Sequence, residues 1–157
     1  MKRNLHNVVS LKQNNRALIL DAIRRHPISR ADLSRQLGLS KSAVTMLIAE
    51  MMEEGILLEA GPAEKEGQLG RTSILVDLVP SYAFAVGVTL HRRYIAVCAT
   101  DLKANCLFRV RESIDTFAEP DEAVAWITRT VREELERNGL PFSDCVGIGV
   151  SSPGPLD

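Results

Sequence analysis

Residues 28–48 have the sequence ISRADLSRQLGLSKSAVTMLI, which predicts two short helices joined by a tight turn. Ser29 is a favourable N-cap for the first helix, and Asp32 follows at the spacing of a capping box. Gly38 lies where this helix must end, because glycine adopts the left-handed C′ conformation without a Cβ penalty. Ser40 is then the expected N-cap of the second helix. The whole stretch has the pattern of a helix-turn-helix.

The second predicted helix has two different faces. Apolar side chains at helical spacing are expected to be buried: Val44, Leu47, Ile48 and Met51. The opposite face is short and polar and has no acid before Glu50, which suits insertion into the major groove of DNA. The expected contacts with DNA come from the start of this helix: Ser40, Lys41, Ser42, Thr45 and Met46. A helical hairpin that does not touch DNA is the alternative, and the residues that follow weigh against it.

A β-hairpin is predicted after the helix-turn-helix. Residues 56–58 form a short apolar run, residues 61–70 have the composition of a loop, and residues 71–78 form a second strand. With a further helix at residues 14–25, three helices followed by a hairpin predict a winged helix. Arg71 lies at the hairpin tip, where a narrow minor groove attracts positive charge. A solvent-exposed wing charge is the alternative role of Arg71.

Charge divides the chain into two parts. Residues 1–58 carry nine Lys or Arg and five Asp or Glu, a net charge of +4, whereas residues 59–157 carry ten against fifteen, a net charge of −5. A basic part gains affinity for DNA by releasing counterions from the phosphates, and the acidic part is expected to stay away from them. We therefore expect an N-terminal arm at residues 1–13, a winged-helix domain at residues 14–79 and a second domain at residues 80–157.

The composition is that of a globular protein, with 45% hydrophobic residues in a chain of 157. No apolar run approaches the roughly 20 residues needed to span a bilayer. The polar N-terminus also lacks an apolar signal core, so we expect a cytoplasmic protein without membrane contact. Cys98, Cys106 and Cys145 are widely spaced in apolar sequence, which predicts buried thiols and neither a metal site nor a cofactor.

The second part begins after Pro80 with three strand-like runs, at residues 82–89, 93–100 and 106–111. A helix is predicted at residues 120–138, because apolar side chains recur on one of its faces: Val124, Ile127, Val131 and Leu135. A fourth strand follows at residues 146–150. This βββαβ order is that of the opening half of an RNase H-like lobe. The expected fold is therefore α+β, a winged helix-turn-helix followed by a truncated RNase H-like (actin-like ATPase) half-lobe.

The chain resembles the N-terminal portion of the ROK family (repressor, open reading frame, kinase), in its repressor branch. The matching segments are residues 28–52, the wing ending in Gly70-Arg71, the strand at residues 85–88, and the segment GIGVSSPGPLD at residues 147–157. The resemblance implies a sequence-specific DNA-binding repressor of carbohydrate metabolism genes with a sugar effector. One winged helix reads few base pairs, so a homodimer on a roughly palindromic site is expected.

Kinases of this family carry an Asp-x-Gly phosphate loop after the first strand, whereas this chain has Thr89-Leu90-His91 there. A side chain in place of the glycine would lie where the nucleotide binds. The chain also has no match to the family's second lobe, which a kinase needs to orient its substrates. We therefore expect no enzyme activity. Pro153 and Gly154 resemble the family's sugar-side loop, with a plain strand-ending turn as the alternative, and any sugar binding is expected to be weak or lost.

Three classes of function are thus the alternatives for this chain. A DNA-binding transcriptional regulator is favoured by the combined motifs. A sugar kinase is disfavoured by the altered phosphate loop. A protein-interaction module, in which the winged helix binds a protein, is the third class. Salt-dependent binding to duplex DNA distinguishes the first class from the third.

Overall fold

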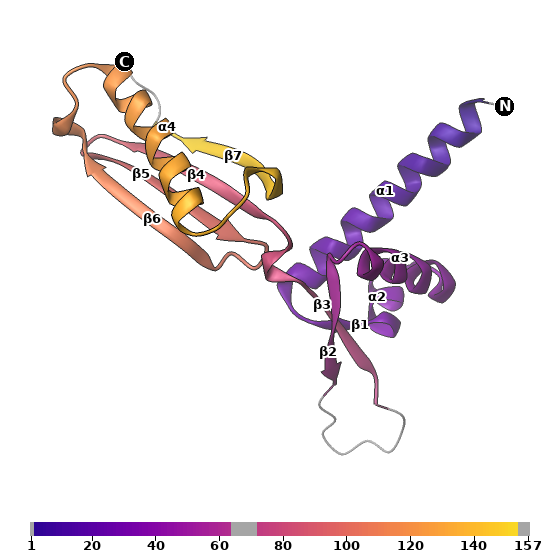
Figure 1. Cartoon of the computed structure of the whole chain (residues 1–157). Coiled ribbons are helices and arrows are strands. Elements are labelled where there is room, and N and C mark those ends of the chain that lie inside the picture. The colour runs from indigo at the N-terminus through magenta and orange to yellow at the C-terminus, as the bar shows by residue number, and fades with distance from the viewer. Residues whose placement is uncertain (1, 64–71, 154–157) are drawn as a thin grey trace. The chain divides into compact units, whose positions relative to one another are not determined.

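The chain folds into two compact units, Met1–Val79 and Pro80–Asp157. The computed structural model describes residues 2–63 and 72–153, with side chains from residue 10 onward. Figure 1 shows helices gathered in the first unit and a broader sheet carrying one long helix in the second. The expected α+β fold is confirmed.

The first unit is a winged helix. Its elements are α1 (Lys2–Arg25), β1 (Ile28–Ser29), α2 (Arg30–Leu37), α3 (Lys41–Glu53), β2 (Leu57–Pro62) and β3 (Ile74–Leu78). The three strands form an antiparallel sheet in the order β1-β3-β2. The core lies between the helices and this sheet, where side chains from every helix and from β3 are fully buried: Ile19, Ile23, Leu33, Val44, Leu47, Ile48, Met51 and Val76.

The first helix is longer than the sequence pattern indicated. Residues 2–13, which the sequence assigns to an N-terminal arm, are helical and form the start of α1. This stretch contains no Gly or Pro, so nothing in the backbone ends the helix early. The helix buries Ile19, Ala22 and Ile23 in the core, whereas Ala17 is exposed.

The second unit has the expected βββαβ order. Its elements are β4 (Phe84–His91), β5 (Tyr94–Asp101), β6 (Cys106–Ser113), α4 (Pro120–Arg137) and β7 (Cys145–Ser151), with short 3₁₀ turns at Pro80–Tyr82, Ile114–Thr116 and Phe142–Asp144. The sheet order is β6-β5-β4-β7, and β7 runs parallel to β4 whereas the other pairs are antiparallel. The crossover that a parallel pair requires is supplied by α4.

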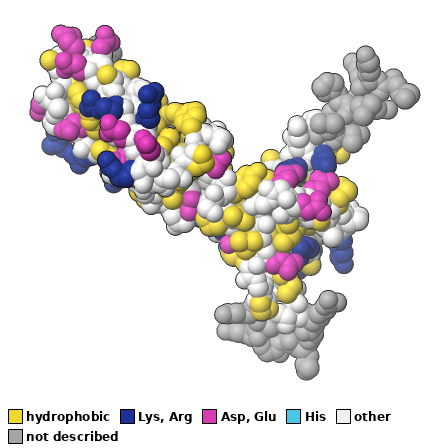
Figure 2. All heavy atoms as spheres, in the orientation of Figure 1, with side chains coloured by type: hydrophobic (Ala, Val, Ile, Leu, Met, Phe, Trp, Pro, Cys, Tyr) yellow, Lys and Arg dark blue, Asp and Glu magenta, His cyan; other side chains and the backbone are white. Residues whose placement is uncertain are grey.

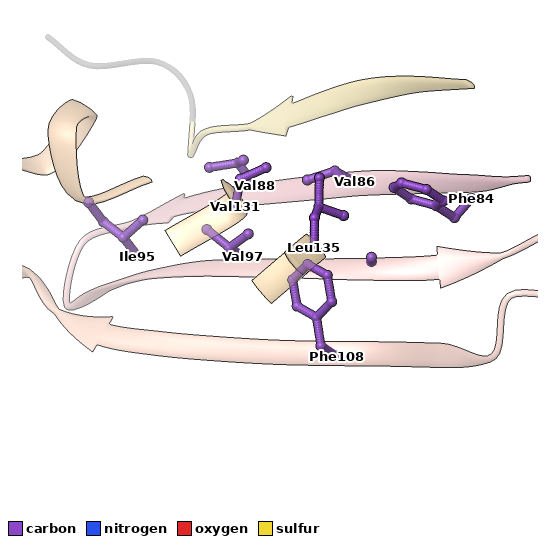
Figure 3. Packing of buried hydrophobic residues seen from close by; sticks show 9 residues of the cluster. Phe84, Val86, Val88, Ile95, Val97, Phe108, Val131 and Leu135 are labelled. Carbon is purple, nitrogen blue, oxygen red and sulfur yellow. The ribbon is translucent and has the colours of Figure 1, made fainter. Parts of the chain in front are cut away.

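The core of the second unit lies between α4 and one face of the sheet. Val131 and Leu135 of α4 pack over alternate residues of the strands, among them Val86 and Val97 (Figure 3). This alternation follows from the twofold repeat of a strand, which points every second side chain to one face. The face of α4 was predicted with one error, because Val124 is 61% exposed. Ala123 and Trp126, which the sequence also favours as core residues on this face, do pack against the core.

The prediction of buried thiols is wrong. Cys106 is exposed, and Cys98 and Cys145 are half-buried, all three as free thiols. Cys106 is the first residue of the outer strand β6, and its thiol donates to the carbonyl oxygen of Phe108 at 3.3 Å. Cys98 alternates with the core residues Val97 and Ala99 and therefore lies on the sheet face opposite α4.

Candidate nucleic-acid interface

The turn between α2 and α3 has the backbone that its sequence requires. Gly38 ends α2 with φ 65° and ψ 21°, the left-handed conformation that glycine adopts without strain. The hydroxyl of Ser34 donates to the carbonyl oxygen of Leu39 at 2.7 Å and so closes the turn from inside. The direction in which α3 leaves the turn is therefore fixed by local contacts.

The start of α2 departs slightly from a capping box. The hydroxyl of Ser29 accepts the backbone N–H of Asp32 at 3.1 Å, as expected of an N-cap. The same hydroxyl donates to the Asp32 carboxylate at 2.6 Å. Ser29 belongs to strand β1 and pairs with Leu75 of β3. The cap of α2 is thus tied into the sheet.

The predicted contact residues lie together at the start of α3. Ser40 is the N-cap, and its hydroxyl accepts the backbone N–H of Ala43 at 3.2 Å and lies 3.1 Å from the Ser42 hydroxyl. Lys41 and Thr45 are exposed on the same helix. Met46 is 53% exposed and adds an apolar side chain to this polar end of the helix.

The opposite face of α3 is buried as predicted, through Val44, Leu47, Ile48 and Met51. The helix α3 therefore has one buried face and one face exposed to solvent. The start of α3 is held by the core while its polar side chains and first backbone N–H groups face outward, an arrangement that suits an anionic ligand.

Two acidic residues near the end of α3, Glu50 and the C-cap Glu54, pair with basic side chains of α1. Lys12 donates to Glu50, with 2.8 Å between the Nζ and Oε2 atoms. Arg16 forms a two-pronged contact with Glu54, and the hydrogen bond from this guanidinium lowers the pKa of the Glu54 carboxyl. Figure 2 shows acidic and basic side chains side by side along α1 and α3. These pairs reduce the negative charge that the interface would otherwise present to phosphate.

Lys41 differs from these residues. None of the ion pairs seen in residues 10–63 and 72–153 involves Lys41. Its ammonium group is thus available at the end of α3 that is free of acids. The α1–α3 ion pairs were missed from the sequence because their partners lie 38 residues apart. No local spacing rule connects residues that far apart.

The wing is built by β2 and β3. The two strands pair from Leu57 opposite Leu78 to Pro62 opposite Ile74, with a bulge between Glu59 and Gly61. Gly61 has φ 98°, which a residue with a side chain rarely adopts. Arg30 of α2 also contacts Glu59 of β2 at 3.1 Å. Arg71 lies outside the described residues, so its predicted contact stays a prediction.

Comparison with known proteins agrees with this geometry. A model of the MarR family matches residues 13–65. The xylose repressor of Bacillus subtilis is 28% identical over 149 residues, covering 93% of this chain and 37% of that protein. The xylose repressor of Bacillus spizizenii is 25% identical over 146 residues, covering 93% and 37% respectively. A solved structure described as a ROK family transcriptional regulator, homologous to the E. coli MLC protein, has a TM-score of 0.63.

The chain is thus similar in sequence to two xylose repressors and in fold to a ROK family transcriptional regulator. The solved ROK regulator is 20% identical to the chain, which covers 36% of it, and this likeness shows the shared fold. The chain spans about 37% of the length of the two xylose repressors. Because the match runs over 92% of this chain, it includes both the winged helix and most of the second unit.

The segment Thr89-Leu90-His91, where the resemblance leads one to expect a phosphate loop in a kinase, forms the end of strand β4. Ser151 at the end of β7 donates to the Thr89 hydroxyl at 3.2 Å, and His91 stacks on Tyr94 with 4.4 Å between ring centroids. Pro153 is exposed just beyond β7. Gly154, its neighbour in the predicted sugar-side loop, lies outside the described residues.

Two further properties of the described residues bear on other classes of function. Within residues 2–63 and 72–153, no helix has the length and apolar content needed to cross a membrane. The same part of the chain contains no group of three or more His, Cys, Asp or Glu side chains placed to hold a metal ion.

Proposed function

We propose that this chain is a sequence-specific DNA-binding transcriptional regulator that represses genes of carbohydrate metabolism in the cytoplasm. The observation that carries the proposal is the start of α3, where Lys41, Ser42, Thr45 and Met46 are exposed on a helix whose other face is buried. The names of the xylose repressors support the repressor role and the link to sugars.

The proposed docking places the N-terminal end of α3 in the major groove. Lys41 and Ser42 are suited to phosphate oxygens, because an ammonium and a hydroxyl are strong donors to a charged acceptor. Thr45 lies one helical turn after Lys41 and is suited to a base edge. Met46 offers an apolar surface to the methyl group of a thymine. Ser40 stabilises the N-terminal end of α3 by accepting a hydrogen bond from the backbone N–H of Ala43.

The remaining parts of the proposal concern partners. Arg71 on the wing adds an electrostatic contact in the adjacent minor groove. Two copies bind a roughly palindromic operator, because one winged helix contacts too few base pairs to select a site in a genome. The second unit acts as a regulatory part with a sugar effector, bound weakly at the loop that includes Pro153, and it does not act as a kinase.

The test uses duplexes selected by the protein from a random-sequence DNA library, with affinity measured by fluorescence anisotropy. The double variant Lys41→Ala/Thr45→Ala should bind the selected duplex more weakly by roughly 1–3 kcal/mol for each residue that touches a base. The dependence of affinity on salt should also become shallower, because one phosphate contact is lost.

The matched control is Arg129→Ala, which removes one exposed positive charge from α4 in the second unit. This variant should bind the duplex as the parent does. If the Lys41/Thr45 double variant binds the duplex with unchanged affinity, the assignment of these contact residues is wrong. Binding by the parent that does not respond to salt would instead favour a protein-interaction module.

A further inference from the structure

Helix α3 lacks the side chains that most often distinguish bases by hydrogen bonding. Its sequence, KSAVTMLIAEMME, contains no Arg, Asn or Gln. In the major groove Arg makes paired hydrogen bonds with guanine, and Asn or Gln makes them with adenine. Lysine also recognises guanine, and it occurs in this helix only as Lys41. The choice of bases by α3 must therefore depend on other contacts.

Lys41 lies to one side of the face that α3 exposes. Ser42, Met46 and Ala49 follow one another at spacings of four and three residues, so these exposed residues form a single stripe along the helix. The stripe is opposite the buried face of α3. Lys41 is displaced from Ser42 by about 100° around the helix axis, the angle between neighbouring residues. Its ammonium group is thus suited to a phosphate at the side of the groove rather than to a base edge.

Acidic side chains limit this stripe on one flank and at one end. Glu50 lies on the flank toward α1, where it pairs with Lys12. Glu53 continues the stripe one turn beyond Ala49 and is exposed, so its carboxylate is repelled by phosphate. The part of the stripe that approaches DNA therefore runs from Ser42 to Ala49. At 1.5 Å per residue this length is about 10 Å, or about three base-pair steps.

Side chains that carry methyl groups occupy the centre of the stripe. Met46 is 53% exposed, and Thr45 and Ala49 beside it are also exposed. Ala49 is four residues from Thr45 and three from Met46, so the three side chains are neighbours on the helix surface. Alanine and the methyl group of threonine pack against the C5-methyl group that marks thymine in the major groove. Removing these apolar groups from water favours the contact.

We propose that α3 distinguishes the bases of its half-site chiefly by the C5-methyl groups of thymines, which Thr45, Met46 and Ala49 contact. The proposal rests on the proposed DNA-binding function and adds the chemistry by which bases are read. The hydroxyls of Ser42 and Thr45 bond to more than one kind of base and orient the helix without selecting a sequence. The operator therefore has thymines, on either strand, at most of the roughly three base pairs that α3 covers.

Reading of methyl groups differs from a general preference for A·T-rich DNA. Uracil pairs with adenine as thymine does and presents the same acceptors in the minor groove, but it lacks the C5-methyl group in the major groove. A contact of Arg71 in the minor groove meets the same acceptors in both duplexes. The exchange of thymine for uracil thus separates the contribution of α3 from that of the wing.

The first experiment makes this exchange in duplexes that the full chain has selected from a random-sequence library. Thymines within the half-sites are replaced by uracil one at a time and then together, and affinity is measured by fluorescence anisotropy. Each contacted thymine should cost about three- to fivefold in affinity, the effect of burying one methyl group. Uracil at thymines outside the half-sites is the control and should leave the affinity unchanged.

The second experiment supplies the methyl group without thymine. One contacted T·A pair is replaced by C·G or by 5-methylcytosine·G, two pairs with the same hydrogen-bonding groups. The methylated duplex should bind more tightly than the unmethylated one, by the factor that uracil loses at that position. Equal affinity of these two duplexes contradicts contact with the methyl group.

The third experiment identifies the protein side of the contact. Met46→Ala should bind the thymine duplex more weakly, and its loss on exchange to uracil should shrink at the position that Met46 contacts, because the two partners are coupled. The matched control is Leu11→Ala, which removes a 61% exposed apolar side chain from α1. It should keep both the affinity and the full loss on exchange. Thermal melts check that each variant is folded. If Met46→Ala leaves every uracil effect unchanged, the assignment of Met46 is wrong.

Two results overturn the reading of methyl groups as a whole. One is unchanged affinity when all thymines of the half-sites are replaced by uracil, and the other is a selected operator without thymine beneath α3. Failure of this inference is separable from failure of the proposed function. Salt-dependent binding to a selected duplex that does not respond to uracil contradicts only the reading of methyl groups. A parent protein that binds no duplex contradicts the proposed function, and this inference with it.

Discussion

Gly38 decides where α2 ends and α3 begins. Its φ of 65° lies in the left-handed region, and a Cβ atom added there meets no atom within 4 Å. Any cost of substitution therefore comes from backbone strain and not from a clash. Because α3 carries the proposed DNA contacts, this strain acts on the orientation of the interface as well as on stability.

We expect Gly38→Ala to reduce the free energy of unfolding by about 1–2 kcal/mol, because alanine is strained in the left-handed conformation. Urea denaturation of the two proteins measures the difference. Gly38→Asn is the control, since asparagine visits this conformation more readily than other residues, and it should lose less. Equal losses for alanine and asparagine would contradict the explanation by strain.

Arg71 is the second residue whose role is testable by itself. We expect Arg71→Ala to weaken DNA binding and to reduce a preference for A·T-rich sequence beside the operator, because a narrow minor groove concentrates negative potential. Anisotropy titrations with A·T-rich and G·C-rich flanks measure this preference. A parent protein with equal affinity for both flanks would show that Arg71 is a solvated charge.

Among the elements, α2 and α3 were predictable because their signals are local. Ser29, Gly38 and Ser40 mark the ends of these helices within a few residues of sequence. Strand β1 was not predictable in this way, because its two residues are ordered by pairing Ile28 with Val76 across the fold. The same holds for Arg16 and Glu54, whose contact depends on how α1 packs beside α3.

The ion pair between Arg16 of α1 and Glu54 at the end of α3 should make the stability of the fold depend on pH. Arg16 lowers the pKa of Glu54 from its ordinary value of 4.5, so the ionised carboxylate stabilises the fold above that value. The contribution is lost as the pH falls through the lowered pKa. We expect the melting temperature of Glu54→Gln to fall less than that of the parent between about pH 5 and pH 3, since the substituted side chain does not titrate.

Thermal melts at several pH values measure this difference. Glu53→Gln is the matched control, because Glu53 is the exposed neighbour of Glu54 and takes part in none of the ion pairs seen in the described residues. It should follow the parent. The comparison must be between variants, because Asp21 also has a pKa lowered by Arg24 and adds its own acid dependence. Parallel curves for all three proteins would contradict a stabilising Arg16–Glu54 pair.

At the scale of the whole molecule, the sequence predicted a basic part and an acidic part, and the structure adds where these charges lie. Glu50 and Glu54 pair with Lys12 and Arg16 of α1, so the excess positive charge is not spread evenly over the first unit. The succession of strands and helix along the second unit was also predictable, because strand-like apolar runs and a helix-like spacing of apolar residues can be told apart in the sequence. The exposure of side chains at the sheet edges was not predictable, because it depends on which strands are outermost in the sheet.

We expect the second unit to bind neither ATP nor a hexose tightly. Thr89-Leu90-His91 ends β4 and lacks the acid and the glycine that the resemblance leads one to expect in a phosphate loop, and Pro153 is exposed to solvent, so a sugar beside it would keep much of its surface in water. Isothermal titration calorimetry with ATP and a panel of hexoses should show no ATP binding and, for a sugar, a dissociation constant no tighter than about 1 mM, a weak affinity on the usual scale. A micromolar isotherm for either ligand would contradict this expectation.

Strand β3 is the middle strand of the small sheet and hydrogen-bonds with both β1 and β2. Through β1 it holds the residue that caps α2, and through β2 it holds the wing. The wing and the cap of α2, which flank the proposed DNA-binding surface, are therefore both attached to β3. The losses of DNA affinity caused by a wing substitution and by an α3 substitution should then not be additive. A wing that no longer contacts DNA would also allow α3 to change its orientation in the major groove.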